Sequence, residues 1–164
     1  MKYWPHWFSF YPILIKVMQM SSGPVLELGM GQGSTPLLHN LCLASGRELV
    51  SYENDKAYYD MHAHFHKPHH KLHFVEDWDK IDISQVWSVA FIDHNPAGRR
   101  RIEAKRLINN CQFVVLHDTQ PEDNKFYRFI EDCFNKYKYR YDYTKIKPWT
   151  SVLSNFVNVQ EVLK

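Results

Sequence analysis

One stretch near the amino end decides the fold: Val25-Leu26-Glu27-Leu28-Gly29-Met30-Gly31-Gln32-Gly33-Ser34-Thr35. Four residues with strand character run directly into three glycines at alternate positions, and residues 35–43 then have the pattern of a helix. Glycine permits tight turns and leaves no Cβ between the backbone and a ligand. A glycine loop between a strand and a helix therefore predicts a ligand-binding turn.

The rest of the chain continues the alternation of strand and helix. We expect further strands at residues 48–52, 72–75, 86–92 and 113–116, and helices at 9–20, 55–66, 99–109 and 122–134. Two strands without a helix between them, 137–143 and 151–159, close the chain. This order predicts an α/β fold: a Rossmann-like, doubly wound, mostly parallel seven-stranded sheet with an antiparallel edge hairpin, in three αβα layers.

Length and composition limit the classes of protein that this chain can be. With 164 residues, of which 45% are hydrophobic and 23% charged, we expect one globular domain over residues 1–164, with residues 1–21 as an N-terminal helical and aromatic segment. No apolar run reaches the roughly 18 residues of a membrane span. No signal-peptide pattern opens the chain, and the three cysteines lack close spacing. We therefore expect a cytoplasmic protein with no membrane partner.

The charge disfavours nucleic acid as a partner. Tyrosines alternate with basic residues between Tyr137 and Lys145, and such a face could stack on a single strand. The net charge, however, is only +2, too small for a strong nucleic-acid field. Six histidines between His62 and His73 suggest a solvated surface rather than a metal site, because no cysteine or acid is spaced with them.

The spacing of the glycines separates two cofactor classes. A dinucleotide fingerprint needs a third glycine at Ser34, whereas this loop reads G-x-G-x-G with Glu27 two residues before the first glycine. That pattern resembles the class I S-adenosyl-L-methionine (SAM)-dependent methyltransferases, over roughly residues 22–158. The resemblance implies that Gly29, Gly31 and Gly33 hold SAM, with Glu27 near the methionine amino end.

Two more acids extend the resemblance. Glu53 ends the second expected strand, where a carboxylate accepts hydrogen bonds from both ribose hydroxyls of the cofactor. Asp77 and Trp78 follow the third expected strand. The resemblance implies that Asp77 meets the adenine amino group and that Trp78 packs on the adenine ring.

Titratable residues follow the fourth and fifth expected strands. The fourth ends in Asp93-His94-Asn95 and the fifth in His117-Asp118, and these ends share the ligand-binding edge of such a sheet. Apolar strands that stop in titratable groups point to chemistry. We expect catalytic roles for these four titratable residues and acceptor binding by two neighbours; the catalytic set is Asp93, His94, His117 and Asp118, and the binding set is Asn95 and Arg99.

Two mechanisms remain open at this edge. Either His94 or His117 removes the acceptor proton as a general base, or Asp93 and Asp118 hold Mg²⁺ or another divalent cation that activates a hydroxyl. Acids after both strands resemble the metal-dependent small-molecule O-methyltransferases. Thr119 departs from that pattern, which usually has asparagine after the second acid.

The function we expect is SAM-dependent methyl transfer to a small-molecule acceptor, at oxygen. The alternative is a non-catalytic protein of the same fold that binds SAM or its product S-adenosylhomocysteine (SAH). A nicotinamide enzyme is disfavoured by Ser34. The aromatic N-terminal residues, including Trp4 and Trp7, would suit a cover over the cofactor or a dimer interface, so a homo-oligomer remains an alternative to a monomer.

Overall fold

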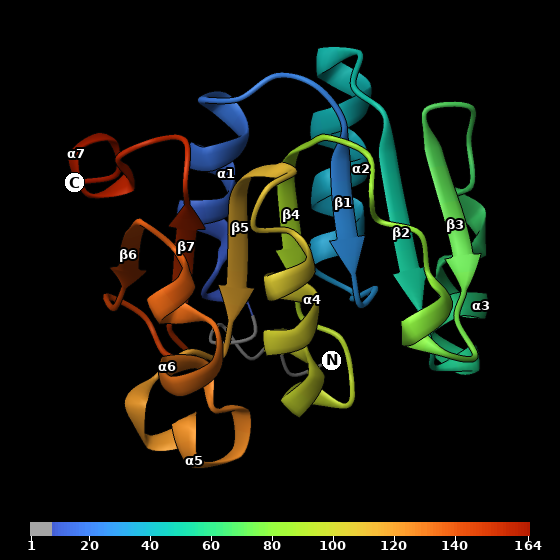
Figure 1. Cartoon of the computed structure of the whole chain (residues 1–164). Helices are drawn as coiled ribbons and strands as arrows, with labels where there is room; N and C mark the ends of the chain where they lie inside the picture. Colours follow the sequence, from blue (N-terminus) through green and yellow to red (C-terminus); the bar gives the residue numbers. More distant parts are fainter. Residues whose placement is uncertain (1–7) are drawn as a thin grey trace.

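The computed structural model describes residues 8–164, apart from the side chains of residues 124, 126, 130 and 131. Trp4 and Trp7 therefore lie outside the described residues. Seven strands form one sheet in the order β3-β2-β1-β4-β5-β7-β6 (Figure 1). Their bounds are β1 Val25–Leu28, β2 Leu49–Glu53, β3 His70–Phe74, β4 Trp87–Ile92, β5 Cys111–His117, β6 Tyr139–Tyr143 and β7 Thr150–Ser154.

The pairing of the strands confirms the fold class predicted from the sequence. β3, β2, β1, β4 and β5 run parallel, and β7 inserts antiparallel between β5 and β6. The chain builds outward from β1 to β3 and then returns to the other side of β1 with β4. In open α/β sheets, ligands bind beyond the carboxyl ends of the strands at this reversal, here between β1 and β4.

Helices cover both faces of the sheet. In Figure 1, α1 and α2 lie behind the sheet and α4 lies in front. Among the described residues, no helix combines the length and apolar character that a membrane crossing requires. The helix bounds are α1 Tyr11–Gln19, α2 Ser34–Ser45, α3 Lys56–His62, α4 Arg100–Arg106, α5 Asn124–Tyr127, α6 Phe129–Asp132 and α7 Val159–Val162.

Each face of the sheet has its own apolar core. Val89 and Phe91 of β4 pack with Leu14 of α1, whereas Ala90 and Ile92 belong to the core that includes residues of α4. This division follows from the strand, in which successive side chains point to opposite faces. All six residues of β4 are buried, as expected for a central strand covered on both sides.

The expected helix at residues 122–134 is wrong as a single element. The structure divides this stretch into α5, α6 and two 3₁₀ turns, Pro121–Asp123 and Phe134–Lys136, with Arg128 in the left-handed region at φ 52°. Phe129 and Phe134, both buried, lie about 140° apart around a continuous helix. The breaks allow both rings to enter the same core cluster.

The expectation of a solvated histidine stretch is also wrong in part. His62 and His70 are buried. His70 begins β3 and points inward, with Nε2 2.8 Å from Ser51 Oγ and Nδ1 3.0 Å from His39 Nδ1. Burial lowers the pKa of His70 to about 3, so it is a neutral core histidine.

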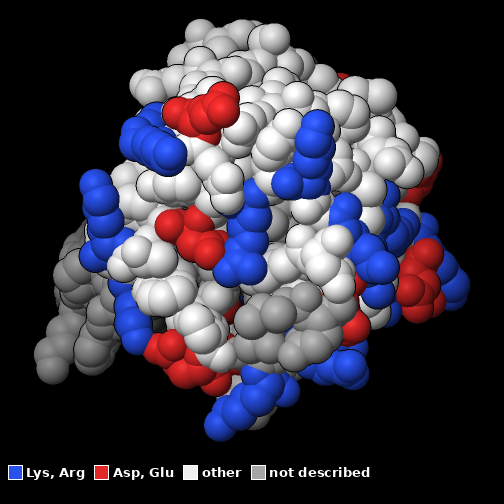
Figure 2. All heavy atoms as spheres, turned by 60° about the vertical axis from the view of Figure 1, so that its left-hand side comes forward, with Lys and Arg blue, Asp and Glu red and all other residues white. Residues whose placement is uncertain are grey.

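The aromatic and basic residues of β6 are largely engaged within the molecule. Tyr139, Tyr141 and Tyr143 pack partly against the core on the α1 side. The Arg140 guanidinium pairs with Asp142 at 2.6 Å. Figure 2, which brings this side of the molecule forward, shows basic side chains interspersed with acidic ones rather than one continuous basic field.

Candidate active site

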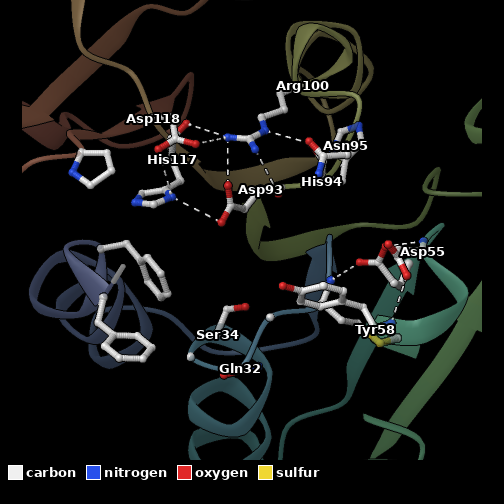
Figure 3. A pocket seen from close by; sticks show the side chains of 17 residues that line it. Gln32, Ser34, Asp55, Tyr58, Asp93, His94, Asn95, Arg100, His117 and Asp118 are labelled. Atoms are coloured by element: carbon white, nitrogen blue, oxygen red, sulfur yellow. Dashed lines mark hydrogen bonds and ion pairs between the residues drawn. The ribbon is translucent and has the colours of Figure 1, made fainter. Parts of the chain in front are cut away.

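A cavity of about 470 Å³ opens beyond the carboxyl ends of the central strands (Figure 3). This volume is within the range of small-ligand pockets. Residues from four strand ends, from α2, α3 and α4, and from the segment before α1 meet around it. They are Phe8, Phe10, Met30, Gly31, Gln32, Gly33, Ser34, Glu53, Asp55, Tyr58, Asp93, His94, Asn95, Arg100, His117, Asp118 and Pro148.

Glu53 lies at the end of β2, where its carboxylate faces the cavity and is 6% exposed. Its Oε2 accepts the Met30 N–H at 2.8 Å and its Oε1 accepts the Asp55 N–H at 2.6 Å. Burial raises the pKa of Glu53, and these backbone donors oppose that shift. A carboxylate has about four acceptor sites, so acceptor capacity remains for ligand hydroxyls beside these backbone bonds.

Asp55 and Tyr58 join Glu53 in the cavity wall because α3 begins next to it. The Asp55 carboxylate caps this helix by accepting the N–H groups of Ala57 and Tyr58 at 2.8 and 3.2 Å. The cap fixes the entry of the chain into α3. Tyr58, one turn into the helix, then stands at the mouth of the cavity (Figure 3).

The three glycines of the loop have different surroundings. Gly31 and Gly33 line the cavity. Gly29 does not: it has φ +95°, and a Cβ there would lie 2.6 Å from the backbone N and Cα of His94. Gly29 therefore allows the loops after β1 and β4 to touch. At Gly33 a Cβ would lie 2.3 Å from the ring of Phe8, so the segment before α1 packs directly on the glycine loop.

Glu27 lies beneath this loop, fully buried and outside the lining of the cavity. Thr35 Oγ1 donates to its Oε1 at 3.0 Å and accepts the Gly31 N–H at the same distance. Ser51 Oγ donates to its Oε2 at 2.6 Å. Burial raises the pKa of Glu27 to about 7, although these hydroxyl donors oppose the shift. Glu27 therefore supports the loop from below.

The structure does not bring Asp77 and Trp78 to the cavity. The Asp77 carboxylate caps the 3₁₀ turn Trp78–Lys80 by accepting the Asp79 N–H at 3.0 Å. Trp78 is 5% exposed, and its ring packs on His94 with 4.1 Å between ring centroids. The expected adenine contacts of this pair do not follow from this arrangement.

The two acids expected on the acceptor side, Asp93 and Asp118, do lie close together. Asp93 follows β4 and Asp118 follows β5, and Arg100 Nη1 lies between them at 2.9 Å from Asp93 Oδ1 and 2.8 Å from Asp118 Oδ2 (Figure 3). Asp118 has φ 59°, a strained region for a residue with a Cβ, and such strain clusters at functional sites. Burial alone would raise the pKa of Asp93, but the charges of Arg100 and His117 outweigh it and hold this pKa low.

His117 is held on both ring nitrogens. Its Nδ1 lies 3.3 Å from Asp93 Oδ2, and its Nε2 lies 3.0 Å from Ser9 Oγ, which in turn donates to the Pro148 carbonyl at 2.6 Å. Burial opposes protonation, yet the charges of Asp93 and Asp118 raise the pKa of His117 above its ordinary value. The structure therefore favours a protonated His117, which leaves no lone pair for a base.

His94 lines the cavity, but its side chain is buried. Its side chain has no exposure, and its Nε2 lies 3.2 Å from the equally buried Glu103 Oε2. Burial lowers the pKa of His94 even though Glu103 opposes the shift. The ring contacts both Trp78 and Glu103.

The two expected acceptor-binding residues differ in position. Asn95 lines the cavity, and its carbonyl accepts the Trp78 indole N–H at 3.0 Å. Arg99 lies outside the lining, because its guanidinium pairs with Asp79 at 2.7 Å and Glu103 at 2.9 Å. The arginine that reaches the site is its neighbour Arg100.

Sequence reasoning missed several residues of the cavity wall. Periodicity could have identified Arg100, because it shares a helix face with the buried Ala104 and Leu107. The sequence predicts Asp55 as the N-cap of a helix, but nothing in it places Tyr58 at the cavity. The other missed wall residues are Met30, Gln32, Ser34 and Pro148.

Comparisons with known proteins point to one fold. No protein-family model matches the sequence, and no curated protein matches it. Among solved structures, an O-methyltransferase from Bacillus cereus in complex with SAH has TM-score 0.67 and 13% identity, over 93% of this chain and 82% of that one. Human methyltransferase-like protein 13, also with SAH, has TM-score 0.67 and 11% identity, over 93% and 84%.

A putative RNA methyltransferase from Pyrococcus horikoshii adds a third likeness, with TM-score 0.57 and 18% identity over 91% of this chain and 84% of that one. This chain has the fold of the SAM-dependent methyltransferases. At these identities the likeness concerns the fold, so the chemistry of this methyltransferase-fold protein has to be argued from its own cavity.

Proposed function

We propose that this protein is a SAM-dependent methyltransferase that methylates an oxygen of a small-molecule acceptor. One observation carries the proposal: a single cavity has the glycine loop and Glu53 at one end and the paired acids Asp93 and Asp118 at the other. A cofactor held at the first end would face an acceptor held at the second. This placement matches the ligand position at the sheet reversal of α/β folds.

Glu53, Gly31 and Gly33 are the residues that we assign to cofactor binding. The remaining lone pairs of Glu53 suit the two ribose hydroxyls, and the glycines allow close approach to the backbone. Tyr58 and Asp55 extend the same wall. SAM would supply an electrophilic methyl group on a sulfonium sulfur.

Asp93 and Asp118 are the residues that we assign to the acceptor. Their side chains are 27% and 22% exposed, so each carboxylate is open to a hydroxyl from the cavity. A hydroxyl becomes strongly acidic as its oxygen gains a methyl group. Asp93, although its pKa is low, is therefore basic enough to take the proton and pass it to water. His117 and Arg100 hold these acids in place.

Transfer of a labelled methyl group from SAM to a panel of small hydroxyl compounds tests this function. We expect product with wild type and a loss of about 100-fold in rate with Asp93→Asn, the size of a general-base contribution. Asp82→Asn serves as the matched control, because Asp82 lies outside the cavity wall and is expected to leave the rate unchanged.

Three results would contradict the proposal in different ways. Tight SAH binding with no transfer to any acceptor would favour the non-catalytic binding protein. Transfer to RNA, but not to small hydroxyl compounds, would overturn the acceptor assignment. Equal rates for wild type and Asp93→Asn would remove Asp93 from the reaction.

A further inference from the structure

Asp93, His117 and Asp118 form the one group among the described residues whose ligand atoms lie close enough to hold a metal ion, within 4.8 Å of one another. The resemblance to metal-dependent O-methyltransferases predicts a divalent cation on Asp93 and Asp118. The position of Arg100 decides whether these residues fit one. Its guanidinium stands between the two carboxylates and pairs with one oxygen of each (Figure 3).

Every oxygen of the two carboxylates already faces a nitrogen of Arg100 or His117. Asp93 Oδ1 and Asp118 Oδ2 face Arg100 Nη1 at 2.9 and 2.8 Å. Asp93 Oδ2 and Asp118 Oδ1 face His117 Nδ1 at 3.3 and 3.6 Å. The four side chains form a closed ring in which the two acids alternate with Arg100 and His117.

Arg100 is fixed in this place by the backbone as well. Its Nε donates to the His94 carbonyl at 3.0 Å, its Nη1 to the His117 carbonyl at 3.3 Å and its Nη2 to the Asp93 carbonyl at 3.2 Å. The side chain is 5% exposed. A buried guanidinium with these partners cannot swing into water without breaking its hydrogen bonds to three carbonyls and its ion pairs with two carboxylates.

Binding of a divalent cation within this ring would be energetically unfavourable. The cation would lie beside a buried guanidinium that cannot lose its proton, and like charges at such distances repel strongly. The carboxylate oxygens would have to abandon Arg100 and His117 in order to coordinate it. The donor set therefore does not fit a divalent metal, although the residue types suit one.

We propose that Arg100 is the resident cation of this site, in the place where a related enzyme would hold a divalent metal. Arg100 is thus a positioning residue that sets the separation and orientation of Asp93 and Asp118. The acceptor would be held by hydrogen bonds to these acids rather than by coordination. The acceptor-binding role of Asp93 and Asp118 rests on the proposed function. The assignment of Arg100 as the cation of this site does not.

Calorimetric titration of the full chain with Mg²⁺, without SAM, tests this assignment. We expect no saturable binding to wild type. Removal of the guanidinium in Arg100→Ala should expose the two acids and create a Mg²⁺ site at least roughly tenfold tighter than any wild-type binding. Adding Asp118→Asn to Arg100→Ala should abolish the new site. Arg100→Lys keeps a positive charge at this position and should therefore gain no Mg²⁺ site.

Arg101→Ala is the matched control, because it removes the neighbouring arginine of α4, whose partner Asp132 lies away from the acid pair. It should gain no Mg²⁺ site. Saturable wild-type binding that Asp118→Asn removes would overturn the proposal, and so would folded Arg100→Ala that gains no site. If Arg100→Ala does not fold, wild type and Asp118→Asn decide alone. SAH binding, titrated separately, reports on the proposed function and leaves the cation result unaffected.

Discussion

Buried Glu27 is expected to make the stability of the protein depend on pH. Its carboxylate has no exposure and is bound by two hydroxyls, Thr35 Oγ1 and Ser51 Oγ. Burial raises its pKa to about 7, from an ordinary value of 4.5. Through Thr35 the same carboxylate is linked to the Gly31 N–H of the cavity wall. Ionisation of Glu27 therefore acts on the loop from inside the fold.

Replacement of this residue by glutamine should flatten part of the dependence of stability on pH. Because the pKa of Glu27 is higher in the folded state than in the unfolded chain, its contribution to stability is complete below about 4.5 and is lost as pH rises through about 7. The full difference is about 3 kcal/mol. Thermal unfolding between pH 5 and 8 should show Glu27→Gln losing less stability toward high pH than wild type.

The control for this experiment is Glu48→Gln. Glu48 is exposed and pairs with Lys71 at 2.7 Å, so its replacement should preserve the wild-type profile. Parallel profiles for Glu27→Gln and wild type would show that Glu27 is not held protonated by the fold.

At the scale of elements, the contact between the loops after β1 and β4 joins the two ends of the cavity. Gly29 provides it, because only a residue without Cβ allows the backbone of His94 to come so near. Asp93 lies directly before that contact. The first glycine of the motif therefore shapes the acceptor side of the cavity, although the resemblance assigned it to the cofactor.

Substitution of Gly29 by alanine should destabilise the protein by about 2–4 kcal/mol, because a left-handed backbone and a clash with His94 add together. Gly46→Ala is the matched control: it has φ +66° but no atom within 4 Å of its Cβ position, so only about 1 kcal/mol is expected. Urea unfolding measures both. Equal losses for the two variants would mean that the contact with His94 has no energetic role.

The helix α4 shows what sequence reasoning finds and where it stops. Three consecutive arginines at its start, Arg99 to Arg101, suggest a role because cations are unfavourable at a helix N-terminus. The residue chosen from them for acceptor binding was Arg99, whereas Arg100 faces the cavity. Helical periodicity distinguishes Arg100 from Arg99. Only the structure shows that Arg100 bridges the acids that follow two different strands.

At the scale of the whole molecule, the positions of the central strands were predictable because β1, β4 and β5 are short, mainly apolar runs bounded by turn residues. The ends of β4 and β5 were predictable for the same reason, so Asp93 and Asp118 could be paired in advance. The breaks in the helix around Arg128 were not predictable. The sequence around Phe129 and Phe134 is compatible with one helix, and the need for a break follows only from the packing of both rings in the core. The burial of His70 likewise depends on Ser51 and His39, which are distant in sequence.

The proposed function requires an adenosyl cofactor in the cavity. Calorimetric titration with SAM, SAH and NAD, on wild type, Glu53→Ala and the surface control Glu48→Ala, tests it most directly. We expect wild type and Glu48→Ala to bind SAM and SAH but not NAD, and Glu53→Ala to lose about 10- to 100-fold in affinity while remaining folded. Binding of NAD, or of no adenosyl ligand by folded wild type, would contradict the account.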